Sequence, residues 1–207
     1  MSVQEVKDAW IYLDRNTGIW RGEVQAAQGV FQPIHWVAMH RMHCVLRLSP
    51  HEGRIVDIGC SYGIFTLNLA WKKPRAEVLG LDPDDTRLVV ARQLLTEHRL
   101  SNCKFQRGTV EEPGIPARSC SGVICTETLD HIKDAKAHLK ELVDRLLDLL
   151  LPGGRLILSI PALEEAGRET MPLPPSPLSM QDFAFLPKII EDRNCPRWWH
   201  LFYVDKV

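Results

Sequence analysis

The stretch RIVDIGCSYGIF, residues 54–65, decides the fold. It begins as a short apolar strand carrying an acid, Asp57, and passes through a turn of small residues into a helix. This arrangement is the usual way in which α/β proteins hold a nucleotide-type cofactor. The same letters contain G-x-S-x-G over residues 59–63, the turn that presents the nucleophilic serine of an α/β-hydrolase. Ser61 is therefore either a nucleophile or part of the floor beneath a ligand.

Strand-like and helix-like segments alternate beyond this stretch. We predict strands at 54–58, 76–82, 103–110, 121–127 and 155–160, and helices at 63–71, 84–100 and 135–150. Several of these strands lack polar alternation, which is typical of parallel strands covered by helices on both faces. The sequence therefore predicts an α/β fold built on a doubly wound, mostly parallel sheet.

The two ends of the chain are less regular. A capping box at Ser2–Glu5 predicts a helix over about 3–14, and Pro33 opens a second helix that ends near Leu48. After Pro161 we predict a proline-rich loop, a short helix within 180–192 and a last strand within 197–207. We expect three segments of one domain: an N-terminal helical cap that shapes the substrate site (1–50), a cofactor-binding core (51–161) and a segment that completes it (162–207).

Composition limits the classes of function. The 207 residues, 45% of them hydrophobic, suit one globular domain, and a net charge of −1 gives no support for nucleic-acid binding. Six scattered cysteines without a C-x-x-C pair indicate reduced thiols in a cytoplasmic protein. The charged N-terminus argues against a signal peptide. The longest uncharged run, 24–40, contains glutamines and a proline, so we expect no membrane span.

The hydrolase hypothesis meets a problem of position. An α/β-hydrolase places its serine after several strands and after the loop that supplies the oxyanion hole, whereas a helical segment without H-G-G-G precedes this one. Asp182 and His200 would complete a triad with Ser61 in chain order, but any chain of this size offers such a trio by chance. A dinucleotide loop, G-x-G-x-x-G, also fits badly because Ser61 and Ile64 stand at two of its glycine positions.

Five motifs in order resemble those of the class I S-adenosylmethionine-dependent methyltransferases that act on small molecules. VDIGCSYGIFTLNLA is similar to D-x-G-x-G-x-G, with Ser61 at the middle glycine, and VLGLDPDDTRLVVARQLL is similar to the second motif. The remaining three are FQRGTVEE, VICTETLDHIKD and LLPGGRLILSIP. The resemblance covers residues 55–161 and implies a Rossmann-like methyltransferase fold with S-adenosylmethionine as cofactor and S-adenosylhomocysteine as product.

The resemblance also implies roles for individual residues. Asp82 would accept the ribose hydroxyl hydrogens, and Thr109 stands where the family commonly has an aspartate for the adenine amino group. Ser61 would lie in the floor beneath the cofactor and would not act as a nucleophile. The implied cofactor contacts are Asp57, Gly59, Cys60, Ser61, Gly63, Asp82, Pro83, Thr109, Val110 and Thr126.

Methyl transfer is an in-line attack on the sulfonium methyl group by an O, N, S or C atom of a small-molecule acceptor. The protein mainly aligns donor and acceptor, and a base is needed only for a weakly acidic acceptor. His131 and Glu127 are the candidates for that base. We expect no metal, because no acid or distant cysteine pair completes the cluster His35, His40, His43 and Cys44.

The C-terminus leaves alternatives open. Members of the family usually end with a helix and an antiparallel strand pair, and only 46 residues follow Pro161. The chain could have a reduced sheet edge, complete the edge as a homodimer, or have lost activity. Ser61, Thr109 and the short tail favour a methyltransferase-like subunit that serves as a partner-binding module. Asp57, Gly59, Gly63 and Asp82 favour the enzyme, and the hydrolase remains a remote alternative.

Overall fold

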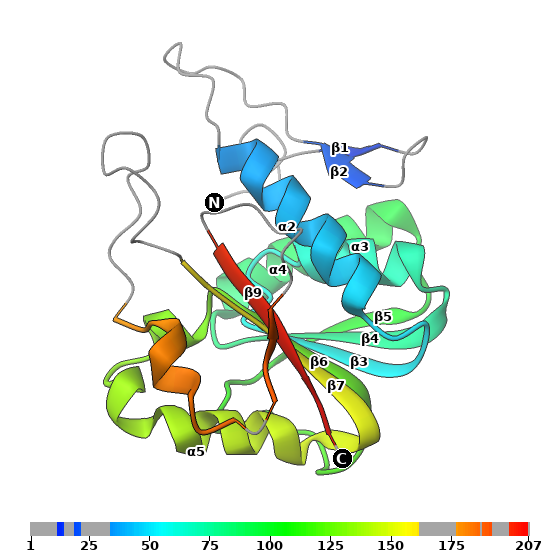
Figure 1. The fold of residues 1–207 in the computed structure, drawn as a ribbon. Helices are drawn as coiled ribbons and strands as arrows, with labels where there is room; N and C mark the ends of the chain where they lie inside the picture. The colour runs from blue at the N-terminus through cyan, green and yellow to red at the C-terminus, as the bar shows by residue number, and fades with distance from the viewer. Residues whose placement is uncertain are drawn as a thin grey trace.

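A computed structural model describes residues 12–14, 19–21, 34–161, 177–186, 188–191 and 199–206. Its main sheet contains seven strands: β3 (Glu52–Ile58), β4 (Arg75–Asp82), β5 (Cys103–Arg107), β6 (Cys120–Thr126), β7 (Leu150–Pro161), β8 (Ile190–Glu191) and β9 (Trp199–Asp205). The helices are α2 (Ile34–Leu48), α3 (Ile64–Lys72), α4 (Asp85–His98) and α5 (Ala135–Asp148), with short 3-10 turns η1 (Leu129–His131) and η2 (Met180–Phe183). Figure 1 shows α2 and α3 on one side of the sheet and α5 on the other.

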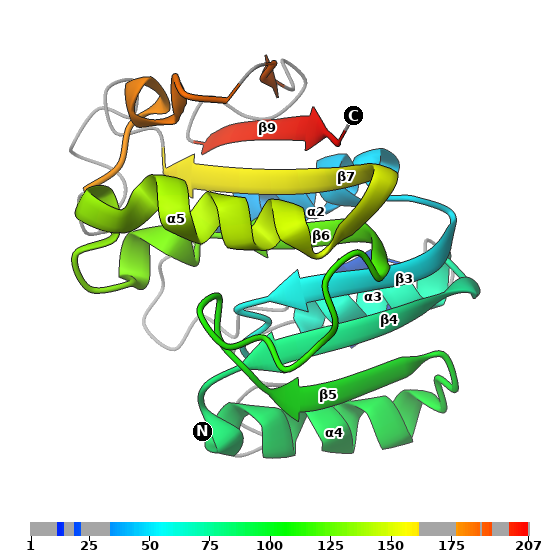
Figure 2. The same ribbon diagram turned by 90° about the horizontal axis from the view of Figure 1, so that it is seen from below.

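The strand order is β5-β4-β3-β6-β7-β9-β8. The first five strands in this order are parallel, whereas β9 runs antiparallel to β7 and β8 antiparallel to β9. Figure 2 shows the opposed arrows of β7 and β9 at one edge of the sheet. The prediction of a doubly wound, mostly parallel α/β fold is confirmed.

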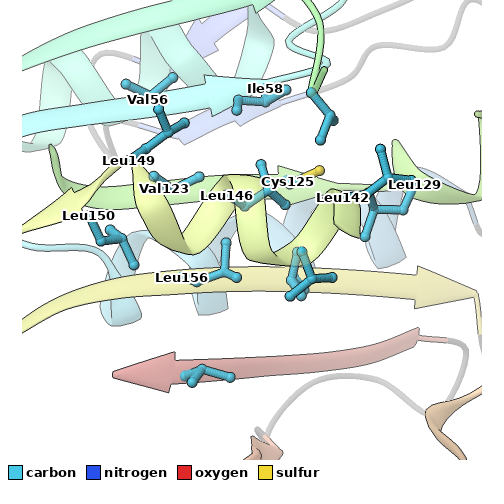
Figure 3. Packing of buried hydrophobic residues seen from close by; sticks show 14 of the residues in the cluster. Val56, Ile58, Val123, Cys125, Leu129, Leu142, Leu146, Leu149, Leu150 and Leu156 are labelled. Carbon is cyan, nitrogen blue, oxygen red and sulfur yellow. The ribbon is translucent and has the colours of Figure 1, made fainter. Parts of the chain in front are cut away.

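Neighbouring residues of each central strand point to opposite faces of the sheet and pack against different helices. Ile55 packs with residues of α2, α3 and α4, while the next residue, Val56, packs with residues of α5. Ile124 and Val123 repeat this division on β6. Figure 3 shows the α5 layer, where Val56 and Val123 lie among the leucines of the helix. Both faces are buried, which explains why the strands lack polar alternation.

The N-terminal segment differs from the expected helical cap. The helix from Pro33 to Leu48 is confirmed as α2, but Tyr12–Asp14 forms a strand, β1, that pairs antiparallel with β2 (Ile19–Arg21). The predicted helix over 3–14 is therefore wrong at its end, and residues 3–11 lie outside the described residues. The sequence between the two strands, Arg15–Gly18, is rich in turn formers, which favour reversal of the chain over a continued helix.

The C-terminal edge contains both antiparallel strands and is reduced only in length. β9 pairs with β7 over seven residues, whereas β8 has two. The chain supplies these strands itself, so a second copy is not needed for them. The short helix expected within 180–192 is present only as η2, which Ser179 and Asp182 cap reciprocally, and the residues 162–176 of the predicted proline-rich loop lie outside the described part of the chain.

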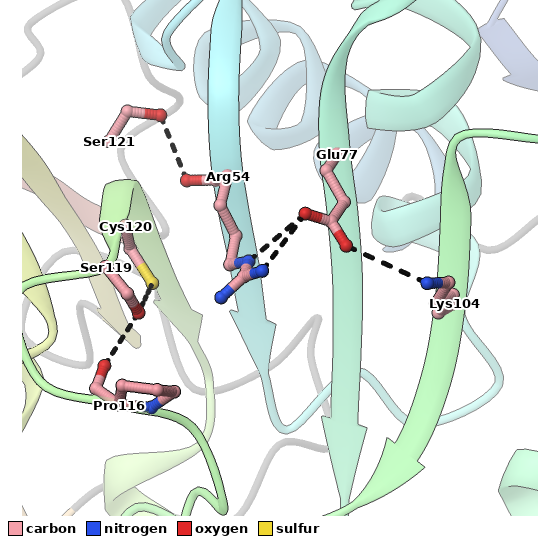
Figure 4. Close-up of polar contacts among 7 residues, drawn as sticks. All are labelled: Arg54, Glu77, Lys104, Pro116, Ser119, Cys120 and Ser121. Carbon is pink, nitrogen blue, oxygen red and sulfur yellow. Dashed lines mark hydrogen bonds and ion pairs between the residues drawn. The ribbon is translucent and has the colours of Figure 1, made fainter.

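The amino ends of β3, β4 and β5 carry a row of alternating charges (Figure 4). Arg54 lies 3.2 Å from Glu77, and Glu77 lies 3.9 Å from Lys104 on the next strand. The Ser121 hydroxyl donates to the Arg54 carbonyl oxygen at 3.0 Å and so ties β6 to β3. This end of the sheet is a set of exposed cross-strand pairs, and the site lies at the opposite end.

Candidate functional site

The turn after β3 is fastened to the end of β4. The amides of Gly59 and Cys60 both donate to the Leu81 carbonyl oxygen, at 2.8 and 2.9 Å, and the Gly63 amide donates to the Cys60 carbonyl at 2.8 Å. The turn therefore has a fixed shape before any ligand arrives. It lies at the carboxyl edge of the parallel strands, where α/β proteins bind ligands.

Glycine is required at position 59 both by the backbone conformation and by the side chain of Thr128. Its φ is +78°, and a Cβ atom there would lie 2.1 Å from the Thr128 Oγ1 atom. That hydroxyl lies 3.1 Å from the carbonyl oxygens of both Ile58 and Thr126, to which it can donate. Thr128 thus joins the ends of β3 and β6, and only glycine leaves room for it.

Ser61 belongs to the floor of the turn. Its φ is +51°, and its amide donates to Asp82 Oδ2 at 2.8 Å. The other oxygen of Asp82 accepts the Asp84 amide at 2.9 Å, and the side chain is only 2% exposed. Asp82 therefore ties the turn to the start of α4 and presents little surface to a ligand.

The triad that the hydrolase hypothesis required is not assembled. Asp182 accepts from the amide and hydroxyl of Ser179, at 2.8 and 2.9 Å, and pairs with Lys136 at 3.0 Å. His200 lies 3.0 Å from Glu191 on the neighbouring strand. Both proposed partners of Ser61 are engaged elsewhere.

A pocket of about 300 Å³ opens above the turn. It is bounded by the carboxyl ends of β3 and β6 and by residues from α2, α3 and α4. Seven residues of the predicted site line it: Asp57, Gly59, Cys60, Ser61, Thr126, Glu127 and His131. The structure thus brings together residues that the sequence separates by up to 74 positions, from 57 to 131.

Asp57 is a buried acid at the base of this pocket. Its Oδ2 atom accepts a hydrogen bond of 2.6 Å from the Thr66 hydroxyl on α3. The pKa of Asp57 is raised from 3.8 to about 6, chiefly by burial; the Thr66 hydrogen bond opposes the shift and the nearby Asp82 carboxylate adds to it. A cationic ligand beside Asp57 would favour the ionised carboxylate.

Glu127 forms an ion pair with Arg41 of α2 across the pocket. Its backbone is in the left-handed region, with φ +51°, a strained conformation for a residue other than glycine. Burial raises the pKa of Glu127, and the Arg41 guanidinium counteracts this. The guanidinium carbon also lies 5.2 Å from the centre of the Phe65 ring, a cation–π distance.

Five predicted cofactor contacts do not line the pocket: Gly63, Asp82, Pro83, Thr109 and Val110. The Val110 side chain is buried in the α5 layer, and the Thr109 hydroxyl accepts the Glu112 amide at 3.0 Å within its own turn. Gly63 instead makes room for a neighbouring ring: with φ +80°, a Cβ atom there would lie 2.5 Å from Phe105. The roles of these five residues as cofactor contacts stay predictions.

Sequence reasoning missed six residues of the lining: Arg41, Met42, Tyr62, Ile64, Phe65 and Arg87. Three of them, at positions 62, 64 and 65, belong to the quoted motif itself, so their nearness to the turn was available as a signal. Arg87 lies in the first turn of the helix after Asp82, which is a weaker signal. No sequence signal marked Arg41 and Met42, because their position beside the pocket depends on how α2 packs.

Among the described residues, no three His, Cys, Asp or Glu side chains gather as a metal site would require. None of the described helices is long and apolar enough to cross a membrane. Cys60, Cys103, Cys120 and Cys125 are buried thiols that form no disulfide. Burial raises the pKa of Cys60, so its thiol stays protonated at neutral pH.

Comparison with known proteins identifies the architecture of a class I methyltransferase. Residues 55–154 match the methyltransferase domain family. The chain is 28% identical over 138 residues to a ubiquinone biosynthesis O-methyltransferase of Acinetobacter baylyi, covering 62% of this chain and 53% of that protein. It is 30% identical over 104 residues to an uncharacterized methyltransferase of Schizosaccharomyces pombe, covering 47% and 37%. The chain spans about half the length of the first relative.

A crystal structure of a SAM-dependent methyltransferase from Aquifex aeolicus superposes with a TM-score of 0.65 at 13% identity. The match covers 80% of this chain and 89% of that one. This likeness concerns the fold. Together, the two comparisons show that residues 55–154 form a methyltransferase domain and that the chain has the fold of an S-adenosylmethionine-dependent methyltransferase.

Proposed function

We propose that this chain binds S-adenosylmethionine in the pocket above the Gly59–Gly63 turn and transfers its methyl group to a small-molecule acceptor. The observation that carries the proposal is the pocket itself, which gathers Asp57, the turn, Thr126, Glu127 and His131 at one edge of the sheet. The relatives named as ubiquinone biosynthesis O-methyltransferases support a small-molecule acceptor.

The two acids of the pocket suit a ligand with a fixed positive charge. The sulfonium and the ammonium of the cofactor are cations, and Asp57 and Glu127 are the acids of the lining. Arg41, already paired with Glu127, offers its guanidinium to the cofactor carboxylate. The protein's main contribution is then to hold the methyl group in line with the acceptor atom.

The reaction breaks the bond between sulfur and methyl carbon and forms one between that carbon and the acceptor. S-Adenosylhomocysteine leaves, and an acceptor that carries a proton loses it. His131 is exposed and lines the pocket, so it suits proton transfer better than Glu127, which the ion pair with Arg41 holds. Glu127 is then the electrostatic partner of the sulfonium.

The acceptor would enter from the side of the N-terminal segment. α2 contributes Arg41 and Met42 to the pocket, which supports a substrate-shaping role for residues 1–50. We propose residues 51–161 as the cofactor-binding core and 162–207 as the completing segment. The cytoplasmic location expected from the cysteines stays a prediction.

Calorimetric titration tests the function. We expect S-adenosylmethionine and S-adenosylhomocysteine to bind the wild type at micromolar concentration. Glu127→Gln keeps the size of the side chain and removes its charge, so it should weaken S-adenosylmethionine at least fivefold and S-adenosylhomocysteine, which lacks the sulfonium, less. Asp85→Asn, on the exposed start of α4, is the matched control. Failure of the wild type to bind either ligand at millimolar concentration would contradict the proposal.

The second candidate is a methyltransferase-like subunit that binds a partner. Asp82 favours it, because both oxygens accept backbone amides and its side chain is almost fully buried. Thr109 favours it too, because its hydroxyl serves the turn around Glu112. Failure of the wild type to bind the cofactor would favour that partner-binding role.

A further inference from the structure

Arg87 lines the pocket from the side of β4, the strand that ends at Asp82, the predicted ribose contact. It is in the first turn of α4, five positions after Asp82 at the end of β4, and it lines the pocket together with Ser61 and Tyr62 of the turn. The predicted adenine contact Thr109 does not line the pocket, and neither do Pro83 and Val110, two other predicted cofactor contacts.

The cap of α4 holds Arg87 in place. Asp84 is the N-cap residue, and its Oδ1 atom accepts the amide and the hydroxyl of Thr86 at 2.9 and 2.6 Å. Its Oδ2 atom lies 3.3 Å from the Arg87 Nε atom. Pairing through Nε fixes one edge of the planar guanidinium and leaves its flat faces available.

Charge decides which end of the cofactor can lie there. The guanidinium and the sulfonium are both permanent cations, so the sulfonium must lie away from Arg87. Asp57 and Glu127, the acids of the lining, attract the sulfonium to the other part of the pocket. The proposed function assigns the cofactor carboxylate to Arg41, so the part left for Arg87 is the uncharged purine, whose π face attracts a guanidinium.

We infer that Arg87 is a positioning residue that stacks on the adenine of the cofactor and replaces the expected contacts from Thr109 and Val110. The inference rests on the proposed function. It makes recognition of adenine depend on a side chain of the first turn of α4, fixed by the helix cap.

The test uses two ligands, S-adenosylhomocysteine and 5′-methylthioadenosine, which lacks the amino-acid end. We expect Arg87→Ala to weaken both by the same factor, about 3- to 30-fold, the range of a partly desolvated cation–π contact. Arg87→Lys keeps the charge without the planar face and should recover only part of the loss. Arg92→Ala, on the same helix but bonded to the Phe105 carbonyl, is the matched control and should leave both affinities unchanged.

A spectroscopic readout separates stacking from a merely structural role. The adenine absorption of bound 5′-methylthioadenosine should shift with wild type and with Arg92→Ala, and the shift should shrink with Arg87→Ala. Equal affinities for wild type, Arg87→Ala and Arg87→Lys would overturn the role of Arg87 and leave the proposed function standing. A wild type that binds neither ligand would overturn both.

Discussion

Asp57 is a carboxyl group held in surroundings that disfavour its charge. Its pKa in the folded chain is about 6, above the ordinary 3.8, chiefly because the side chain is buried. The folded state therefore binds more protons than the unfolded state between about pH 4 and 6, and stability falls as pH rises through that window. At neutral pH the buried carboxylate therefore destabilises the folded state, which is common where a site binds a cationic ligand.

Asp57→Asn should consequently stabilise the unliganded protein at pH 8, by about 1–3 kcal/mol, because the buried charge is removed while an oxygen remains for the Thr66 hydroxyl. The gain should shrink toward zero by about pH 4. Urea unfolding of variant and wild type over this range measures it, with the exposed Asp85→Asn as control. A variant less stable than wild type at pH 8 would contradict this, because it would show that interactions in the folded state stabilise the charged Asp57 carboxylate.

A comparison of substitutions at Gly59 and Gly153 distinguishes the cost of backbone strain from the cost of a steric clash. Both have positive φ, +78° and +76°, but a Cβ at Gly153 meets nothing within 4 Å, whereas one at Gly59 meets Thr128 at 2.1 Å. Gly153→Ala should cost about 1 kcal/mol for the left-handed backbone alone. Gly59→Ala should cost at least about 2 kcal/mol more, because the Thr128 bridge must move. Equal denaturation midpoints for the two variants would refute the steric argument.

At the scale of elements, β9 contributes to both faces of the sheet. Leu201 packs with the α2, α3 and α4 layer, and Phe202 packs in the α5 layer, where its ring meets Phe183 edge-to-face at 4.9 Å between centroids. This contact fastens η2 to the antiparallel edge. η2 and β9 are thus part of the core.

Phe202→Ala should cost about 3–5 kcal/mol, because the ring is fully buried. Phe185→Ala, whose ring is 36% exposed, removes the same atoms near the surface and should cost about 1 kcal/mol or less. Thermal unfolding monitored by circular dichroism compares the two. A similar loss for both would mean that β9 is not packed as described.

The elements of the core were predictable because their signals are local. Strands 54–58 and 76–82 and the helix after Asp84 follow from apolar runs, caps and turn residues, and the structure places each within a few positions of its predicted bounds. The pair β1 and β2 was missed because the capping pattern at Ser2–Glu5 was extended as a helix to Asp14, over residues that pair with β2.

The site was predictable only where it coincides with a motif. Of the predicted site residues near strand ends, six line the pocket, because a strand's carboxyl end fixes their place: Asp57, Gly59, Cys60, Ser61, Thr126 and Glu127. Arg41 reaches the same pocket from a helix that no motif marks, and the burial of Val110 depends on packing beneath α5. Such contacts arise from tertiary structure, which local patterns do not encode.

The molecule as a whole depends on its C-terminal strand. β7 uses one edge for β6 and the other for β9, and Arg155 on β7 pairs with Asp205 on β9 at 2.6 Å. A chain that ends at residue 198 would expose the whole edge of β7 and the apolar surface around Phe183.

We expect that truncated chain to lose cooperative unfolding or to aggregate, because an open strand edge beside exposed apolar surface favours association. Light scattering and a thermal melt would report this. The chain that lacks only Val207 is the control and should behave as the wild type. A monomeric truncated chain with an unchanged midpoint would mean that the five parallel strands suffice.

The bridge through Thr128 also constrains how this sequence can evolve. The space that its hydroxyl fills exists only while position 59 lacks a side chain, although the two positions lie 69 residues apart. An ancestor could acquire threonine at 128 only after glycine stood at 59, and a reversal at 59 would destroy the bridge first. In a library that randomises both positions, side chains at 59 should be purged where threonine stands at 128, and better tolerated where a small residue there leaves only the cost of the left-handed backbone.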